Sequence, residues 1–196
     1  MGTIAQALEQ CDRARRRAFA WRDALSVEAK LGLALGMAVA TGLAAQFRIP
    51  LPHTPVPVTG QVFAVLLAGV LLGAGWGTLS MGLYLGLGIA GVPWFAGCTS
   101  TMGVTVGYLI GFVVAAFLIG WVTDRWPGAR HPLLIIFVML LGVGVIYLLG
   151  ALAFAAILRT NLQATLAQAV MPFIVWDVAK ALVAAGVAGA ILPKDS

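Results

Sequence analysis

The chain has 196 residues, of which 61% are apolar and 10% carry a charge, and its formal net charge is +5. Soluble domains carry roughly 25% charged residues, so this composition excludes a water-soluble protein and predicts an integral membrane protein. The length suffices for about six transmembrane helices of ~20 residues with short connections. The predicted fold is therefore a single all-α membrane bundle.

Residues 1–25 form a basic N-terminal tail. Its arginines are Arg13, Arg15, Arg16, Arg17 and Arg22. Basic residues beside a span predict a cytoplasmic flank, which could also rest on anionic lipid. Trp21 and Leu25 could anchor a short interfacial helix, and a frayed basic tail is the alternative. Because the charge is concentrated beside a membrane span, it does not indicate nucleic-acid binding.

The membrane domain is predicted to cover residues 26–192. Its spans are expected at residues 26–46, 59–73, 76–90, 102–122, 133–158 and 172–192. The second and third spans meet at Gly73-Ala74-Gly75, so a single kinked stretch is an alternative. With both termini in the cytoplasm, nine basic residues lie on the inner side and only Arg48 and Arg159 on the outer side. This asymmetry is what the positive-inside rule predicts.

The first span carries two stripes of small residues at every fourth position. The stripes are Gly32, Gly36, Ala40 and Ala44, and Ala34, Ala38 and Gly42. Such stripes permit close contact between helices, so they could dock a partner protein, and they serve internal packing as readily. The candidate docking residues are Gly32, Ala34, Gly36, Ala38 and Ala40.

Two outer connections have patterns of their own. Residues 49–57 include four prolines, which fix φ and lack an N–H donor. This loop is predicted to be stiff and extended, either as a lid over an outward-facing pocket or as a rigid connector. Before the sixth span, Leu162, Leu166 and Val170 recur at helical spacing and predict a short amphipathic helix.

Asp177 and Lys180 are the two charged residues that lie well inside a predicted span. Their i,i+3 spacing places both side chains on one helical face. An ionised residue at a helix centre costs about 2.5–3.5 kcal/mol, so the pair indicates a binding site. The alternatives are a structural ion pair and a Lys180 that snorkels to the surface. One carboxylate and one ammonium suit a ligand that has a carboxylate and N–H donors.

Other polar residues in or near the spans are weaker candidates for the same site. They are Gln61, Tyr84, Thr99 and Tyr108, and for each the alternative is interhelical hydrogen bonding or interfacial placement.

Cys11 and Cys98 lie far apart in the chain, so neither a metal site nor a disulfide framework is predicted. The chain has no nucleotide-binding loop and no hydrolase signature. We therefore expect no enzymatic activity, and any ATP hydrolysis would belong to another subunit.

Several segments together resemble one known family. They are Ile49-Pro50-Leu51-Pro52-His53-Thr54-Pro55-Val56-Pro57, Phe63-Ala64-Val65-Leu66-Leu67-Ala68-Gly69, Gly91-Val92-Pro93, Phe95-Ala96-Gly97, Gly107-Tyr108-Leu109, and Pro172-Phe173 with Asp177 and Lys180. This pattern, over residues 26–192, closely resembles the BioY family, the substrate-binding (S) components of biotin importers of the energy-coupling factor (ECF) type. The loop at residues 98–103 departs from the family, because it is shorter and lacks the usual proline.

The resemblance implies a biotin pocket facing the outside of a prokaryotic cell membrane. It implies an ECF transmembrane coupling protein and ATPase subunits as partners, besides the lipid bilayer itself, and no cofactor in this chain. It also implies that Asp177 and Lys180 hold biotin. We assign Lys180 to the valerate carboxylate and Asp177 to a ureido N–H, with Trp94, Phe95 and Tyr84 as candidate apolar contacts.

The sequence is compatible with three alternatives. The chain could pair with itself as a homo-oligomer. The same architecture could serve another small vitamin. A self-sufficient channel or secondary transporter for a small solute is the rival from a different class.

Overall fold

The computed structural model describes residues 6, 10, 13, 20 and 24–192. Its elements are α2 (Val27–Gln46), β1 (Arg48–Leu51), β2 (Thr54–Thr59), α3 (Gln61–Ile89), η1 (Gly103–Thr105), α4 (Val106–Arg125), η2 (Pro127–Arg130), α5 (Pro132–Leu158), α6 (Leu162–Ala169), η3 (Met171–Phe173) and α7 (Ile174–Ile191). The predicted tail, residues 1–25, lies almost entirely outside the described residues.

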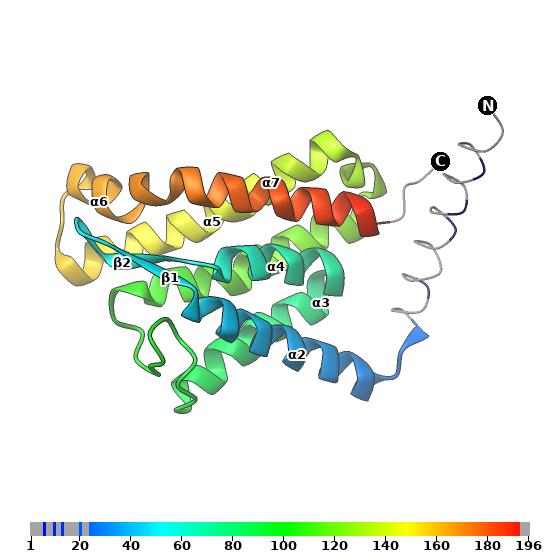
Figure 1. Cartoon of the computed structure of the whole chain (residues 1–196), viewed down its shortest axis with the longest axis horizontal. Coiled ribbons are helices and arrows are strands. Elements are labelled where there is room, and N and C mark those ends of the chain that lie inside the picture. Colours follow the sequence, from blue (N-terminus) through cyan, green and yellow to red (C-terminus); the bar gives the residue numbers. More distant parts are fainter. Residues whose placement is uncertain (1–5, 7–9, 11–12, 14–19, 21–23, 193–196) are drawn as a thin grey trace.

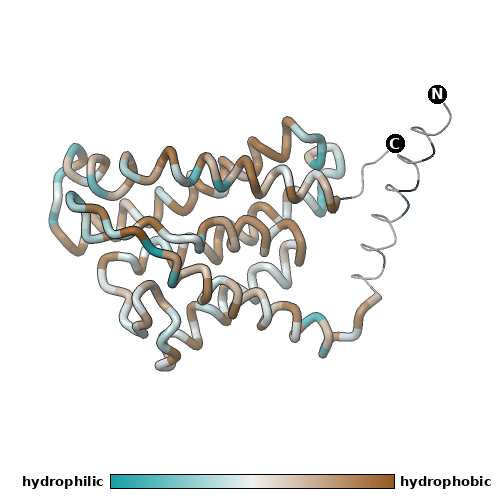
Figure 2. Tube along the Cα trace, in the orientation of Figure 1, coloured by the Kyte–Doolittle hydropathy of each residue, from teal (hydrophilic) through white to brown (hydrophobic). Residues whose placement is uncertain are grey.

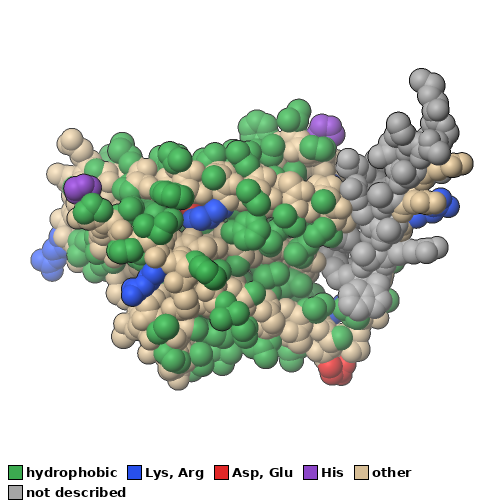
Figure 3. All heavy atoms as spheres, viewed as in Figure 1, with side chains coloured by type: hydrophobic (Ala, Val, Ile, Leu, Met, Phe, Trp, Pro, Cys, Tyr) green, Lys and Arg blue, Asp and Glu red, His purple; other side chains and the backbone are tan. Residues whose placement is uncertain are grey.

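Long apolar helices make up most of the described chain (Figure 1). Five helical segments are long and apolar enough to cross a membrane: Val27–Gln46, Gln61–Ile89, Gly103–Arg125, Pro132–Leu158 and Leu162–Ile191. Apolar residues run along the helices in Figure 2, and apolar side chains cover much of the face in Figure 3. Phe137 is 69% exposed and Val175 78%, which suits contact with lipid rather than water. The predicted all-α membrane fold is confirmed.

Helix α3 reverses direction at Gly73, so its two halves lie side by side. Gly73 has φ 78° and ψ 179°, a conformation that is essentially restricted to glycine. The Gln61 Nε2 atom donates a hydrogen bond to the Tyr84 hydroxyl at 2.7 Å, although a straight helix would separate these residues by about 35 Å. The predicted spans 59–73 and 76–90 are thus the two arms of one interrupted helix.

Close backbone contact holds the reversal in place. A Cβ atom at Gly77 would lie 2.8 Å from the Ala68 carbonyl oxygen, so the two arms pack with almost no side-chain spacer. The Asp124 Oδ2 atom, from the last turn of α4, accepts a hydrogen bond from the Ala74 N–H at 2.9 Å. That contact satisfies one of the free N–H groups at the start of the second arm.

The proline-rich segment forms a two-stranded antiparallel hairpin of β1 and β2. Its register pairs Arg48 with Thr59 and Ile49 with Val58, with an irregularity between Ile49 and Leu51. The predicted extended conformation is confirmed, although strand pairing was not foreseen. Alternate side chains of a strand face opposite sides, and on β2 it is Val56 and Val58 that are buried.

The bundle has two distinct ends in Figure 1. We call the end that carries the β1–β2 hairpin, residues 90–105 and α6 the hairpin end. The predicted short helix before the last span is confirmed as α6, capped by Asn161, whose Oδ1 accepts from the Ala164 N–H. The start of α2 and the end of α7 both lie at the opposite end of the bundle.

Candidate functional site

A cavity lies beneath the hairpin, between β2, α3, α4, α5 and α7; we call it the inner cavity. Its polar lining is Thr59, Gln61, Thr105, Tyr108, Tyr147, Asp177 and Lys180. Its apolar walls include Val56, Val58, Val62, Phe95, Leu109, Phe112, Ile146 and Phe173. Apolar walls with a few convergent polar groups are typical of small-molecule sites.

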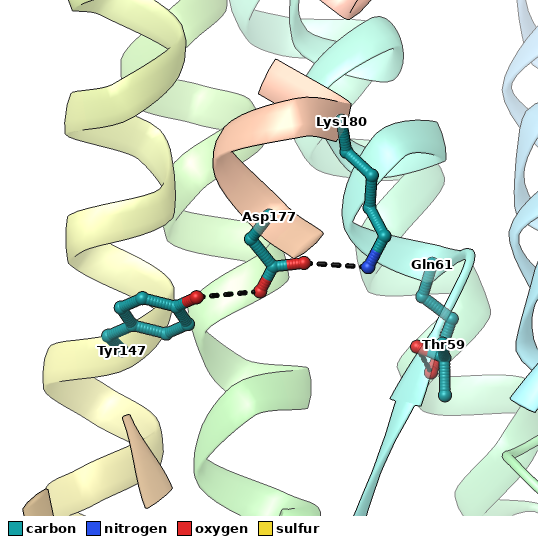
Figure 4. A network of polar contacts seen from close by, with 5 residues as sticks. All are labelled: Thr59, Gln61, Tyr147, Asp177 and Lys180. Atoms are coloured by element: carbon teal, nitrogen blue, oxygen red, sulfur yellow. Dashed lines mark hydrogen bonds and ion pairs between the residues drawn. The ribbon is translucent and has the colours of Figure 1, made fainter. Parts of the chain in front are cut away.

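The Asp177–Lys180 pair is the charged centre of the inner cavity (Figure 4). The Lys180 Nζ atom lies 2.7 Å from the Asp177 Oδ1 atom, and the two side chains are 18% and 5% exposed. Asp177 lies in the first turn of α7, where the helix dipole favours a carboxylate. The pair faces the cavity as the i,i+3 spacing predicts.

Tyr147 of α5 completes this centre, and the sequence analysis missed it. Its hydroxyl donates to the Asp177 Oδ2 atom at 2.9 Å (Figure 4). Each carboxylate oxygen therefore has one protein partner and retains a second lone pair, while the ammonium retains two of its three donors. The signal was present in the sequence, because Tyr147 is the one polar side chain of Pro132–Leu158.

Gln61 lines the cavity from the start of α3, and hydrogen bonds at both its amide oxygen and its amide nitrogen fix the orientation of the side chain. Its Oε1 atom accepts from the Thr59 hydroxyl at 2.9 Å, and its Nε2 atom donates to the Tyr84 hydroxyl at 2.7 Å. Tyr84 is 1% exposed and stands behind Gln61, away from the cavity lining. Tyr84 thus holds the Gln61 amide in position and does not itself line the cavity.

Tyr108 of α4, another of the candidate binding residues, lines the inner cavity. Its hydroxyl donates to the Ala169 carbonyl oxygen at 2.6 Å, which ties α4 to the end of α6. Because that hydroxyl is engaged, Tyr108 offers the cavity chiefly its ring and the acceptor capacity of its oxygen.

Of the predicted residues in the loop after α3, Phe95 lines the cavity and Thr99 does not. Phe95 is 2% exposed, and its ring makes an edge-on contact with the Tyr84 ring, with 5.5 Å between the two ring centroids. The Thr99 carbonyl oxygen accepts from the Phe95 N–H, and its hydroxyl contacts that of Thr101 at 2.8 Å. Thr99 therefore shapes the loop, and Trp94, whose Nε1 atom donates to the Tyr84 carbonyl oxygen, also lies outside the cavity lining.

Gln46, at the end of α2, fastens this loop to the bundle. Its Nε2 atom donates to the carbonyl oxygens of Gly42, Trp94 and Phe95 at 3.0, 3.1 and 3.2 Å. Its Oε1 atom accepts from the Cys98 N–H at 3.1 Å. One side chain thus joins α2 to the segment that carries a cavity wall.

Replacement of Gln46 by leucine should release this loop. The Cys98 N–H then has no side-chain acceptor, and each lost hydrogen bond contributes about 0.5–1.5 kcal/mol. We expect the amides of residues 94–98 to exchange with deuterium about tenfold faster or more, as measured by mass spectrometry. Gln163→Leu, on an exposed glutamine of α6, should leave this exchange unchanged. Equal protection in Gln46→Leu and the wild type would contradict the fastening role.

The two stripes of small residues on α2 have different surroundings. Ala34 and Ala38 are fully buried, and a Cβ atom at Gly42 would lie 3.1 Å from Trp94, so these residues pack inside the bundle. Gly32, Gly36 and Ala40 are exposed. Of the five candidate docking residues, Ala34 and Ala38 are thus inaccessible to a partner, and the exposed stripe is Gly32, Gly36 and Ala40.

A bundle of apolar helices in which a buried acid and a half-buried base line a small cavity defines a ligand-binding membrane protein. The model of the BioY family matches residues 17–194. The chain therefore belongs to the BioY family, a family of prokaryotic multi-pass membrane transporters rather than enzymes.

Individual relatives agree with this assignment. The chain is 34% identical to the biotin transporter BioY of Rhodobacter capsulatus over 176 residues, covering 82% of this chain and 90% of the relative. It is 35% identical to the biotin transporter BioY of Thermotoga maritima over 149 residues, covering 71% and 83%. The crystal structure of an S-component for biotin from an ECF-type ABC transporter is similar, with a TM-score of 0.76 and 25% identity over 85% of this chain and 93% of that one.

Proposed function

We propose that this chain captures biotin outside the cell and delivers it for import as the S component of an ECF-type ABC transporter. The observation that carries the proposal is the Asp177–Lys180 ion pair, which lines a cavity beneath the hairpin. Relatives over most of the chain are named biotin transporters, and the similar crystal structure is an S-component for biotin.

Biotin's chemistry fits this charged centre. Lys180 has two ammonium donors left for the valerate carboxylate, and Asp177 has lone pairs left for a ureido N–H. Charged hydrogen bonds contribute about 1.5–3 kcal/mol each, whereas nanomolar affinity requires about −12 kcal/mol. Most of the affinity must therefore come from apolar contacts, for which Phe95, Phe112 and Ile146 are the candidates.

The proposed topology has six membrane crossings, with both termini in the cytoplasm. The two arms of α3 count as two crossings, because Gln61 and Tyr84 are hydrogen-bonded neighbours. An even number of crossings agrees with the start of α2 and the end of α7 lying at the same end of the bundle (Figure 1). The basic residues of the tail would flank that end, so the hairpin end faces outside. Residues 26–192 then form the membrane domain and residues 1–25 a cytoplasmic tail.

The proposed partners are an ECF transmembrane coupling protein and its ATPase subunits. The chain has no nucleotide-binding loop of its own. The exposed stripe Gly32, Gly36 and Ala40 is a candidate contact, since nothing lies within 4 Å of a Cβ atom placed on Gly32 or Gly36. Small residues allow another helix to approach such a face closely.

Equilibrium binding to the purified, detergent-solubilised chain tests this function. We expect tritiated biotin to bind with a Kd of about 1–10 nM, and unlabelled thiamine, riboflavin or folate not to displace it. Displacement by one of these vitamins would redirect the assignment to another vitamin. Biotin uptake by proteoliposomes that contain this chain alone would instead favour a self-sufficient transporter.

A further inference from the structure

A second cavity lies at the hairpin end, between the hairpin and residues 95–105; we call it the vestibule. The hairpin contributes Arg48, Pro50 and Thr54 to its lining, and the facing segment contributes Thr101 and Met102. Its volume is about 320 Å³, compared with about 60 Å³ for the inner cavity. Pockets for small molecules usually measure about 300–1,000 Å³, so the vestibule is large enough to hold a small molecule.

The vestibule and the inner cavity share one wall. Pro57, Phe95, Ala96 and Thr105 line both of them. Among these residues Phe95 is the largest, and its ring is buried against Tyr84. These shared residues therefore form the partition between a molecule in the vestibule and the cavity that contains Asp177 and Lys180.

Arg48 gives the vestibule a positive charge. Its side chain is exposed, and within the described residues it forms no hydrogen bond or ion pair. A Cβ atom at Gly97 would lie 2.7 Å from the Arg48 Nη1 atom, so the guanidinium extends across to the loop that forms the partition. The acidic residues of the described chain are Glu28, Asp124 and Asp177, and the first two lie in α2 and α4 away from the hairpin end.

We propose that the vestibule is a first binding site for carboxylate ligands, in which Arg48 captures the ligand's carboxylate before the Phe95 partition opens to the inner cavity. This inference rests on the proposed function and adds a step to it. A guanidinium binds a carboxylate through two parallel hydrogen bonds, and a positive charge at an entrance raises the association rate of an anion. Arg48 should therefore act on association, whereas Asp177 and Lys180 act on retention.

Stopped-flow binding of biotin to the full chain in nanodiscs of zwitterionic lipid tests this order of events. We expect Arg48→Gln to lower the association rate about fivefold at ~10 mM ionic strength, where the Debye length is about 30 Å. At ~1 M ionic strength, where the Debye length is about 3 Å, the association rates of Arg48→Gln and the wild type should differ by less than about twofold. The dissociation rate should stay unchanged, and Arg48→Lys should restore most of the association rate.

Two controls separate the vestibule from general charge effects. Arg159→Gln removes the same charge from the same end of the bundle, but Arg159 lines neither cavity, so it should retain the wild-type rate. Biotin amide lacks the carboxylate, so its association should not respond to Arg48→Gln.

The outcomes distinguish this inference from the proposed function. Equal association rates for the wild type and Arg48→Gln, or equal slowing by Arg159→Gln, would overturn the vestibule while biotin binding stands. No binding of biotin to folded wild-type protein would overturn the proposed function, and the vestibule as a biotin site with it.

Discussion

Replacement of Asp177 by asparagine is expected to weaken biotin binding at least about 100-fold, which corresponds to roughly 2.8 kcal/mol. The substitution keeps the side-chain shape but removes the negative charge that lies 2.7 Å from the Lys180 ammonium. A ureido N–H then meets a neutral amide oxygen instead of a carboxylate, so a charged hydrogen bond worth about 1.5–3 kcal/mol is weakened, and the Lys180 ammonium loses the ion pair that holds it in position. Equilibrium binding of labelled biotin to purified protein measures the effect.

Two further variants make this result specific. Tyr147→Phe removes only the hydrogen bond to Asp177 Oδ2, so we expect a smaller loss of affinity, about three- to tenfold. Glu28→Gln neutralises an exposed acid at the start of α2 and should bind biotin like the wild type. Binding by a folded Asp177→Asn protein within about threefold of the wild type, or about 0.7 kcal/mol, would remove Asp177 from the site.

Replacement of Gly73 by alanine should destabilise the whole bundle. Alanine at φ 78° and ψ 179° carries a strain of about 1–3 kcal/mol. Its Cβ atom would also lie 2.6 Å from the Asp124 Oδ2 atom, the acceptor for the Ala74 N–H. We expect the melting temperature in detergent to fall by roughly 5–10 °C, as followed by size-exclusion chromatography after heating.

Gly75 provides a control two residues away. No atom lies within 4 Å of a Cβ placed on Gly75, and glycine in a helix costs about 1 kcal/mol relative to alanine. Gly75→Ala should therefore raise the melting temperature slightly or leave it unchanged. Equal melting of Gly73→Ala and the wild type would show that the reversal tolerates a side chain, contrary to the observed geometry.

Composition and hydropathy predicted the membrane class and the helices closely. The first predicted span, residues 26–46, corresponds to α2 at Val27–Gln46, and the fifth, residues 133–158, to α5 at Pro132–Leu158. The Asp177–Lys180 pair was also predictable, because two charges inside an apolar span are conspicuous in a linear sequence. These features depend on local composition alone.

Features that depend on neighbours in space were less predictable. Helix α5 is apolar around its whole circumference, so no amphipathic pattern shows which face meets the ligand, and Tyr147 gains its role from Asp177, 30 residues later. Tyr84 and Thr99 were placed in the site by their chemistry, but neither lines the inner cavity. Pairing of β1 with β2 escaped prediction because the prolines obscured the strand pattern.

The reversal of α3 also has a practical consequence for protein engineering. The start of α2 and the end of α7 lie at the same end of the bundle (Figure 1). In the proposed topology, two copies of the chain can therefore be joined end to start by a flexible linker that does not cross the bilayer. Such a tandem fusion, with Asp177→Asn in only one half, would report whether two neighbouring copies bind biotin independently.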